Sequence, residues 1–176
     1  MSATTAERVE TPRLVCERLR PEHGDELVPL LSDPRVARWL SSTREPASAA
    51  DVAASLAHKL EHWARYGFGL SLLRDRDTGE MVGRGGLQYT FVAGMSEIEA
   101  GWAIVPGRWG EGLATELAQA AVEVAFGPLG LLRVVAFTLP DNLASRRVMD
   151  KAGFAFEREI EHVGLPHVLY VHRGDK

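Results

Sequence analysis

Apolar and polar positions alternate along the chain in two rhythms, one typical of helices and one of strands. Apolar residues three and four apart define a helix over residues 48–66 and another from about residue 112 to 126. The stripe residues are Val52, Leu56, Leu60 and Trp63 in the first helix and Leu113, Leu117, Ala120 and Val124 in the second. Each stripe covers one side of its helix, so we expect these helices to lie on a sheet.

Shorter segments fill the rest of the chain. Strands are expected over residues 13–19, 68–74, 80–90, 97–105, 133–138, 154–163 and 167–172, and shorter helices over residues 21–31, 33–40 and 142–151. Several strands in succession, followed by helix–strand–helix–strand, predict an α/β (α+β) fold with helices packed on a mixed sheet. No linker interrupts this order, so residues 1–176 are expected to form a single domain, with residues 1–10 as a flexible lead-in.

Composition excludes several classes of protein. The net charge is −4, and no run of Lys and Arg gives the basic patch that nucleic-acid binding needs. No apolar run is long enough to cross a bilayer, and the start MSATTAERVE lacks the core of a signal peptide. We therefore expect a cytoplasmic protein without nucleic-acid or membrane partners. The single cysteine, Cys16, is expected to be a small strand residue rather than a nucleophile.

The clearest candidate site is the turn between the strand at 97–105 and the next helix. Residues 108–115 read RWGEGLAT, with small residues where a ligand would approach the backbone closely. A helix start also presents N–H groups without partners and the positive end of the helix dipole. Together these features predict a phosphate site. The dinucleotide fingerprint does not fit, because Thr115 takes the place of its third small residue, and no Gly-Lys-Ser/Thr of a nucleoside-triphosphate loop follows.

A second motif, HKLEH at residues 58–62, matches the His-x-x-Glu-His pattern of zinc peptidases. His58, Glu61 and His62 are expected on the helix side opposite the apolar stripe, and a solvated face lacks the shielded pocket that a zinc site needs. We therefore expect no metal site. A zinc hydrolase remains an alternative that predicts bound metal.

Four blocks in the same order resemble the GNAT N-acetyltransferase superfamily. Its signature turn, Gln/Arg-x-x-Gly-x-Gly/Ala, corresponds to residues 109–114, with Gly112 and Ala114 in the small positions and Trp109 in place of the polar first residue. The form Trp-Gly-x-Gly-x-Ala-Thr-Glu resembles the ribosomal-protein N-terminal acetyltransferase branch (RimJ/RimL type). The other blocks are residues 31–37 (LSDPRVA), residues 78–87 (TGEMVGRGGL) and the Asn-x-x-Ser…Lys-Ala-Gly-Phe pattern of residues 142–154.

This resemblance implies acetyl-CoA as acetyl donor, a primary amine as acceptor and no metal. It implies a GNAT fold, whose mostly antiparallel mixed sheet splays between the strand before the Gly turn and the next strand. A strand N–H near residues 102–104 would polarise the thioester carbonyl. The residues expected to contact the donor are Ile104, Val105, Trp109, Gly110, Glu111, Gly112, Leu113, Ala114, Thr115, Asn142, Ser145 and Arg147.

Acetyl transfer to an amine needs a base for the amine proton and a proton for the leaving thiolate. On the strand that the resemblance places at the active groove, Glu99 is the first candidate for the base and Glu97 the second. Lying two apart, they share a face; the alternative is that both are solvated charges. Many family members protonate the thiolate with a Tyr where this chain has Met149. Ser145, one turn earlier on the same stripe, is the alternative donor, unless its hydroxyl bonds back to the preceding turn.

Three readings of the function stay open. The first is a cytoplasmic N-acetyltransferase acting on a protein N-terminus or a small amine, and the acidic net charge favours a cationic acceptor. The second is a non-catalytic acyl-CoA sensor, suggested by Met149. The third is the zinc hydrolase. A monomer or a homodimer is expected, with the closing strand at 167–172 as an edge that a second copy would extend.

Overall fold

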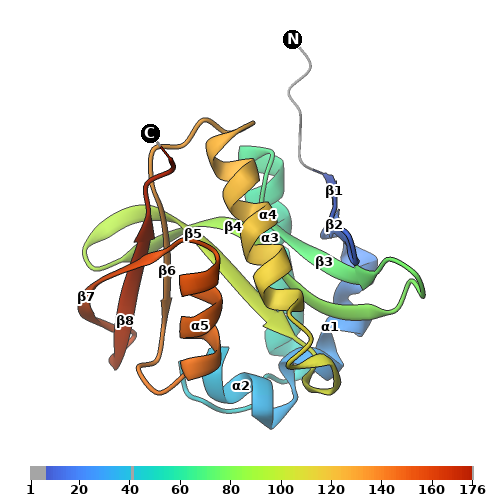
Figure 1. Ribbon diagram of the computed structural model, residues 1–176. Helices are drawn as coiled ribbons and strands as arrows, with labels where there is room; N and C mark the ends of the chain where they lie inside the picture. Colours follow the sequence, from blue (N-terminus) through green and yellow to red (C-terminus); the bar gives the residue numbers. More distant parts are fainter. Residues whose placement is uncertain (1–6, 41, 176) are drawn as a thin grey trace.

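Eight strands form one continuous sheet in the computed structural model, which describes residues 7–40 and 42–175 (Figure 1). The strands follow the order β1-β2-β3-β4-β5-β6-β8-β7. They are β1 (Arg8–Glu10), β2 (Leu14–Arg18), β3 (Leu70–Asp75), β4 (Met81–Val92), β5 (Met95–Ile104), β6 (Val134–Thr138), β7 (Ala155–His162) and β8 (Leu165–His172).

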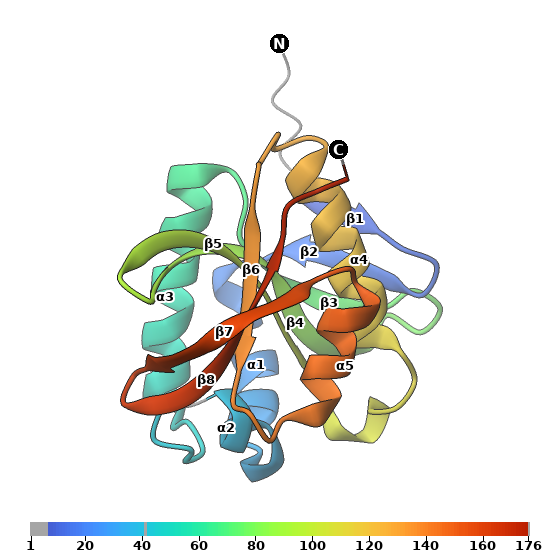
Figure 2. The same ribbon diagram turned by 60° about the vertical axis from the view of Figure 1, so that its left-hand side comes forward.

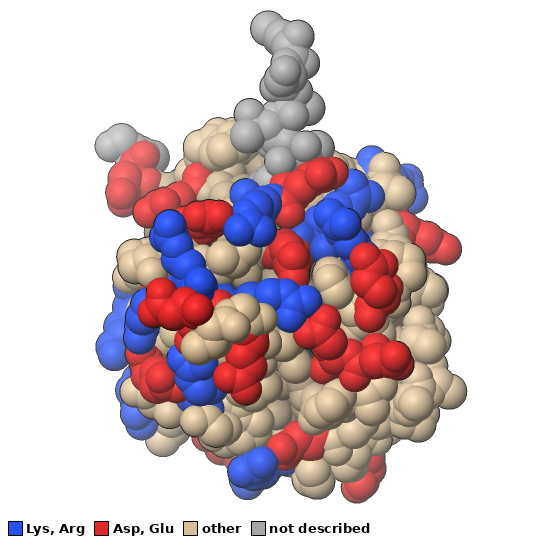
Figure 3. Space-filling view, turned by 90° about the vertical axis from the view of Figure 1, so that its right-hand side faces the viewer, with Lys and Arg blue, Asp and Glu red and all other residues tan. Residues whose placement is uncertain are grey.

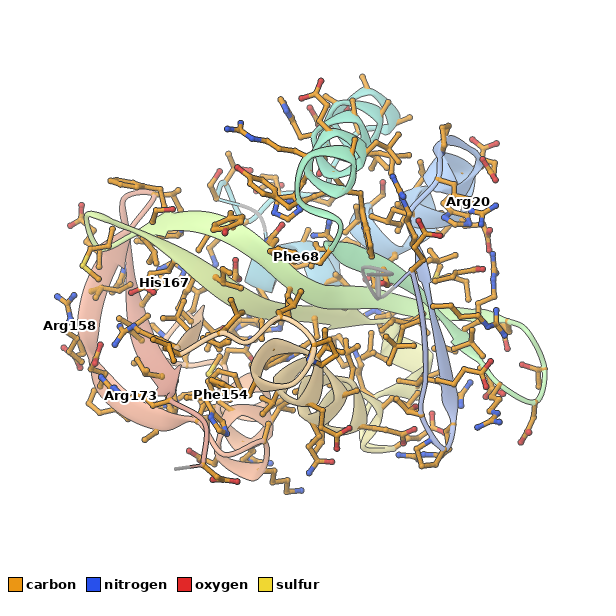
Figure 4. All side chains as sticks on the ribbon, turned by 90° about the horizontal axis from the view of Figure 1, so that it is seen from above. Arg20, Phe68, Phe154, Arg158, His167 and Arg173 are labelled. Carbon is orange, nitrogen blue, oxygen red and sulfur yellow. The ribbon has the colours of Figure 1, made fainter. Side chains whose placement is uncertain are left out.

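Helices cover both faces of the sheet, as Figures 2 and 4 show. Two of them, α1 and α3, lie on one face, and α4 and α5 lie on the other. The helical elements are η1 (Pro21–His23), α1 (Gly24–Leu31), α2 (Pro34–Leu40), α3 (Ala49–Tyr66), η2 (Pro106–Arg108), α4 (Leu113–Phe126) and α5 (Leu143–Lys151). Among the described residues, no helix combines the length and apolar character that crossing a membrane requires.

Local signals explain where the long helix α3 begins and ends. The hydroxyl of Ser48 accepts from the N–H of Asp51 at 3.1 Å, and the Asp51 carboxylate accepts from the N–H of Ser48 at 2.9 Å. This reciprocal pair satisfies two N–H groups at the helix start. At the other end Gly67 has φ 72°, a left-handed conformation that stops the helix and turns the chain into β3.

The central feature of the sheet is the divergence of β5 from β6. These neighbours run parallel and meet at the single bridge Glu99↔Val135, whereas every other neighbouring pair is antiparallel. Beyond that bridge, the second half of β5 has a strand partner only on its β4 side. The mixed, mostly antiparallel sheet and its splay between these two strands confirm the predicted fold class.

Glycines in β4 allow the neighbouring strand β5 and the helix α4 to pack closely against it. A Cβ at Gly83 would lie 2.2 Å from the carbonyl oxygen of Ala103 in β5. A Cβ at Gly85 would lie 2.1 Å from Cδ2 of Leu117, which brings α4 directly onto this strand. The close approach of α4 sets the position of the turn that precedes it.

Three expectations about the chain are wrong in detail. Residues 8–10 are not a flexible lead-in, because β1 pairs with β2; residues 1–6 lie outside the described part. The hairpin of β4 and β5 continues to the pair Val92↔Met95, since Ala93 (φ 52°) and Gly94 (φ 79°) make a tight two-residue turn. Finally, β8 is no edge strand, because it lies between β6 and β7. The edges are β1 and β7.

We predict that Gly83→Ala destabilises the fold by about 1–3 kcal/mol, since an added methyl must push β5 away from β4. Urea or thermal unfolding followed by circular dichroism measures the change. Gly107→Ala is the matched control, because its added Cβ meets nothing within 4 Å and its φ is not left-handed. An unchanged midpoint for Gly83→Ala would contradict the packing described here.

Candidate active site

A cavity of about 660 Å³ opens where β5 and β6 diverge. It has two sides, which we name for the elements that line them. The turn side is formed by the segment before α4 together with the start of α5, and the α2 side by residues of α2, β3, β4 and β5. The α2-side residues are Val36, Trp39, Leu40, Leu70, Arg84, Gln88 and Glu99.

The turn side presents a row of backbone N–H groups. Both Gly110 (φ 81°) and Gly112 (φ 82°) adopt the left-handed conformation, which rolls the chain into α4. Among the described residues, none of the six N–H groups from Gly110 to Thr115 donates a hydrogen bond to the protein; the first to do so is that of Glu116, to the carbonyl of Gly112. All six residues line the cavity. This arrangement suits an anion such as a pyrophosphate.

Side chains hold the turn from outside. Arg108 pairs with Asp75 at 2.9 Å and with Glu111 at 2.6 Å. Arg13 donates to the carbonyl oxygen of Glu111 at 2.7 Å and pairs with the Glu116 carboxylate at 2.8 Å. The turn is therefore fixed before any ligand binds, and Arg108 is committed to protein carboxylates.

The open edge of β5 begins beside this turn. The N–H of Val105 bonds to the carbonyl of Val82 in β4 at 2.9 Å, so the alternation of an antiparallel pair directs the N–H groups of Ile104 and Trp102 toward the splay. The expectation for Val105 is wrong, because its N–H is engaged and the residue does not line the cavity. The Ile104 carbonyl is also occupied, by the indole N–H of Trp109 at 2.7 Å.

The start of α5 brings Asn142, Ser145 and Arg147 to the same cavity. Asn142 caps the helix by accepting from the N–H of Ser145 at 3.3 Å, and its amide donates to the hydroxyl of Thr138 at 3.0 Å. Within the described chain the Ser145 hydroxyl makes no hydrogen bond, so its back-bond to the preceding turn is not formed. Met149 lines the cavity and is 2% exposed.

Glu99 lies at the point where the strands part and faces the α2 side. One carboxylate oxygen accepts from the Gln88 amide at 3.2 Å, and the oxygen of that amide accepts from the Lys59 ammonium at 2.6 Å. Burial raises the pKa of Glu99, and the Gln88 hydrogen bond and the charges of Lys59 and Arg84 oppose that rise. A half-buried carboxylate with a raised pKa on a cavity wall is suited to accepting a proton.

Glu97 is on the same face of β5 but has a different environment. It is 9% exposed, pairs with Arg133 at 3.0 Å and does not line the cavity. Arg133 also pairs with Glu157 of β7 at 3.2 Å. The structure therefore brings Glu99 to the same cavity as Ser145, Asn142 and the turn. Glu97 instead belongs to an ion-pair network that runs from β5 through Arg133 to β7.

The sequence interpretation missed three polar residues near Glu99. Lys59 lies on α3, and Arg84 and Gln88 lie on β4; the last two line the cavity. Their signal was a pair of polar residues four apart in an otherwise apolar and glycine-rich strand, which places both on one face. Nothing in the local sequence indicated that this face meets Glu99.

The residues of the zinc motif do not converge. His62 was expected on the solvated face of the helix, but it packs against β4. Its Nδ1 lies 2.9 Å from the Phe68 carbonyl oxygen, and its Nε2 accepts from the N–H of Tyr89 at 2.9 Å, so both ring nitrogens are engaged. Over residues 7–40 and 42–175 no group of three or more His, Cys, Asp or Glu is arranged to hold a metal. Burial raises the pKa of Cys16 to about 12, which disfavours a thiolate nucleophile.

Known proteins resemble this chain in sequence and in fold. Residues 13–155 match the acetyltransferase (GNAT) domain family. The chain is 28% identical over 154 residues to the uncharacterized N-acetyltransferase YoaA of Bacillus subtilis (strain 168), an alignment covering 85% of this chain and 83% of YoaA.

Two solved structures illustrate the likeness in fold. An acetyltransferase from Agrobacterium tumefaciens str. C58 superimposes with a TM-score of 0.80 at 23% identity, covering 95% of this chain and 94% of that one. RimL, the ribosomal L7/L12 alpha-N-protein acetyltransferase in complex with coenzyme A, gives a TM-score of 0.76 at 17% identity, covering 95% and 98%. By its sequence match and its splayed sheet, the chain belongs to the acetyltransferase (GNAT) domain family and is an acyltransferase.

Proposed function

We propose that this protein transfers the acetyl group of acetyl-CoA to a primary amine by direct attack of the amine on the thioester. The observation that carries the proposal is a path along the cavity wall. Among the described residues the N–H groups of Gly110–Thr115 have no protein partner, and those of Ile104 and Trp102 face the open edge of β5, which leads to Glu99. A pyrophosphate at the turn and an extended arm along the strand edge match that path.

In this proposal the turn and α5 hold the donor. The N–H groups of residues 110–115 bind the pyrophosphate, and those of Trp102 and Ile104 face the pantetheine arm and the thioester carbonyl. Asn142 fixes the start of α5, so that the Ser145 hydroxyl faces the sulfur. The exposed guanidinium of Arg147, at the cavity rim, is available to the nucleotide phosphates.

The reaction itself exchanges one bond for another. A bond forms between the amine nitrogen and the acetyl carbon, the carbon–sulfur bond breaks, and coenzyme A leaves as a thiolate. Glu99 accepts the amine proton, directly or through water, and Ser145 supplies or relays the proton to the thiolate. The acetyl acceptor is a small-molecule amine or a peptide N-terminus; RimL, with the same fold, acts on a ribosomal protein N-terminus. We further propose a cytoplasmic enzyme that works as a monomer or homodimer.

A non-catalytic acyl-CoA sensor is the alternative, and Met149 in place of a tyrosine is the observation behind it. The Ser145 hydroxyl, without a hydrogen bond in the described chain, and the half-buried Glu99 on the cavity wall favour the enzyme, because a sensor needs neither group.

Calorimetric titration with acetyl-CoA and with coenzyme A, in the presence of a chelator, tests donor binding. A free-thiol assay over amines and N-terminal peptides then tests transfer. Binding with thiol release supports the enzyme, and binding without release on any amine supports the sensor. Absence of binding would contradict the role given to the turn at Gly110–Thr115.

We predict that Glu99→Gln lowers kcat by about 10²–10⁴-fold, the usual contribution of a general base, with little change in acetyl-CoA affinity. Because only the ionised carboxylate accepts a proton and burial raises its pKa, kcat/KM of the natural chain should rise with pH through a value above the ordinary carboxyl range. This limb should be missing in Glu99→Gln. Glu97→Gln is the matched control, and an equal loss of kcat in both variants would remove Glu99 from its role.

We predict that Arg13→Ala weakens coenzyme A binding several-fold, because it releases the Glu111 carbonyl and the Glu116 carboxylate that hold the turn. The free energy of unfolding should fall by about 1 kcal/mol, a small value since Arg13 is half exposed. Calorimetry and urea unfolding measure the two effects.

The stability effect of Arg13→Ala should depend on pH. Burial alone raises the pKa of Glu116, but the hydrogen bonds from Thr11 and Arg13 outweigh it and the net direction is downward. The stabilisation by this carboxylate is therefore present above its unfolded pKa and is lost as pH falls through its folded pKa. Arg8→Ala, which removes an arginine paired with Glu10, should leave coenzyme A affinity unchanged; an equal loss of affinity there would contradict a specific role for Arg13.

A further inference from the structure

Arg84 is a cation in the cavity wall without a protein partner. It lies on β4, lines the α2 side and is half-buried. Within the described chain its guanidinium makes no hydrogen bond and no ion pair. No buried side-chain nitrogen among these residues lacks a partner, so the Arg84 nitrogens remain accessible. Because the residue lines the cavity, we take that access to be from the cavity.

Other half-buried arginines of this protein are paired. Arg74 contacts Glu17 and Glu26, and Arg133 contacts Glu97 and Glu157. Arg146 donates to the Tyr170 hydroxyl at 3.2 Å and to a backbone carbonyl at 2.9 Å. Withdrawing a charge from water costs several kcal/mol unless a partner compensates, so the missing partner of Arg84 needs an explanation.

Glu99 does not supply that partner. It interacts electrostatically with Arg84, but its hydrogen bond is with Gln88, and no ion pair joins the two residues within 4.0 Å. Lys59 adds a second cation, held on the far side of the Gln88 amide at 2.6 Å. The cluster of Arg84, Lys59 and Glu99 thus holds two cations and one carboxylate, although Lys59 itself does not line the cavity and the whole chain carries −4. A purely cationic acceptor would add charge of the same sign.

A carboxylate on the acceptor satisfies these constraints. The planar guanidinium fork matches a carboxylate in bidentate geometry, and a negative group beside Arg84 would balance the local charge. Since Arg84 and Glu99 face the same side of the cavity, the acceptor's carboxylate and amine would be close together. The neighbouring wall is apolar, with Val36, Trp39 and Leu40 from α2 and Leu70 from β3.

We propose, building on the acetyltransferase function above, that the acceptor is a free α-amino acid with an apolar or aromatic side chain. Arg84 binds its carboxylate, Glu99 faces its amine, and the α2 wall contacts its side chain. A peptide N-terminus lacks this carboxylate, so the proposal selects one of the two acceptor classes left open above.

Matched acceptors test the proposal in the natural chain. Phenylalanine is compared with phenylalanine amide and 2-phenylethylamine, and leucine with 3-methylbutylamine, by acetyl-CoA-dependent thiol release. We expect kcat/KM to be about 10–100-fold higher for the amino acid than for its partner without a carboxylate, as a charged hydrogen-bonded contact implies. Equal or better use of the partners would overturn the proposal while the acetyltransferase function stands.

Variants test whether Arg84 is the residue that discriminates an amino acid from an amine without a carboxylate. Arg84→Met should bring the amino acid to amine ratio of kcat/KM close to one, mainly through a higher KM for the amino acid, and Arg84→Lys should give an intermediate ratio. Lys151→Met removes a cation of α5 that also lines the cavity and should leave this ratio unchanged. If Arg84→Met lowers kcat/KM equally for the amino acid and for the amine, Arg84 acts through Glu99 or the fold, and the assignment is wrong.

A binding measurement separates failure of this inference from failure of the proposed function. Calorimetry of the natural chain saturated with coenzyme A, titrated with phenylalanine and with 2-phenylethylamine, needs neither turnover nor a folded variant. Tighter binding of phenylalanine supports the proposal. Coenzyme A binding without phenylalanine binding overturns the acceptor assignment alone. Absence of acetyl-CoA binding overturns the proposed function, and the acceptor assignment that rests on it.

Discussion

The single bridge between β5 and β6 is the constraint on which the site depends. Strands in a sheet normally satisfy each other's N–H and C=O groups along their whole length, and an open buried edge is costly. Here β5 pairs with β4 over ten residue pairs but meets β6 only at Glu99↔Val135. The divergence opens the cavity, leaves backbone N–H groups facing into it and places Glu99 where the opening begins.

Side-chain contacts and helix packing hold the segments on either side of this open backbone in place. Arg108, Arg13 and the indole of Trp109 each bond to groups at the turn or at the end of β5. The glycines of β4 allow α4 to pack against the strand, and the turn follows from the position of that helix. Figure 3 shows acidic and basic side chains interspersed on the face formed by the β1–β3 side, where Arg8, Arg18, Arg74 and Arg76 are paired with carboxylates.

Local features were predictable from the sequence, and features set by tertiary register were not. The turn at 110–115 and the helix that begins at Asn142 depend on a few adjacent residues, so the local pattern predicted both. Glu99 was a candidate because of the family resemblance, which places its strand at the active groove, and it lines the cavity. The position of Val105 failed because one residue of register decides which side of a strand its N–H faces, and only pairing with β4 sets that register.

Long-range packing accounts for the other misses. His62 was expected in solvent because a helical stripe describes only the face against the main core, whereas the long β4–β5 hairpin reaches a second side of α3. The meeting of Lys59 with Gln88 and Glu99 joins three elements and has no local signature. The strand at 167–172 seemed terminal in sequence but is internal in space, because β7 folds back outside it.

The same packing links acceptor binding to the chemistry of Glu99. Burial raises the pKa of this carboxyl, while Lys59 and Arg84 favour its ionised form. A carboxylate bound to Arg84 would neutralise one of these cations, and the pKa of Glu99 would then rise further. A carboxylate with a higher pKa is a stronger base, so Glu99 becomes better able to accept a proton at the moment an amine is in place beside it. With an empty α2 side, the charges of Lys59 and Arg84 both oppose the rise that burial causes in the pKa of Glu99. Arg84 would in this way contribute both to the selection of the acceptor and to the timing of the proton transfer.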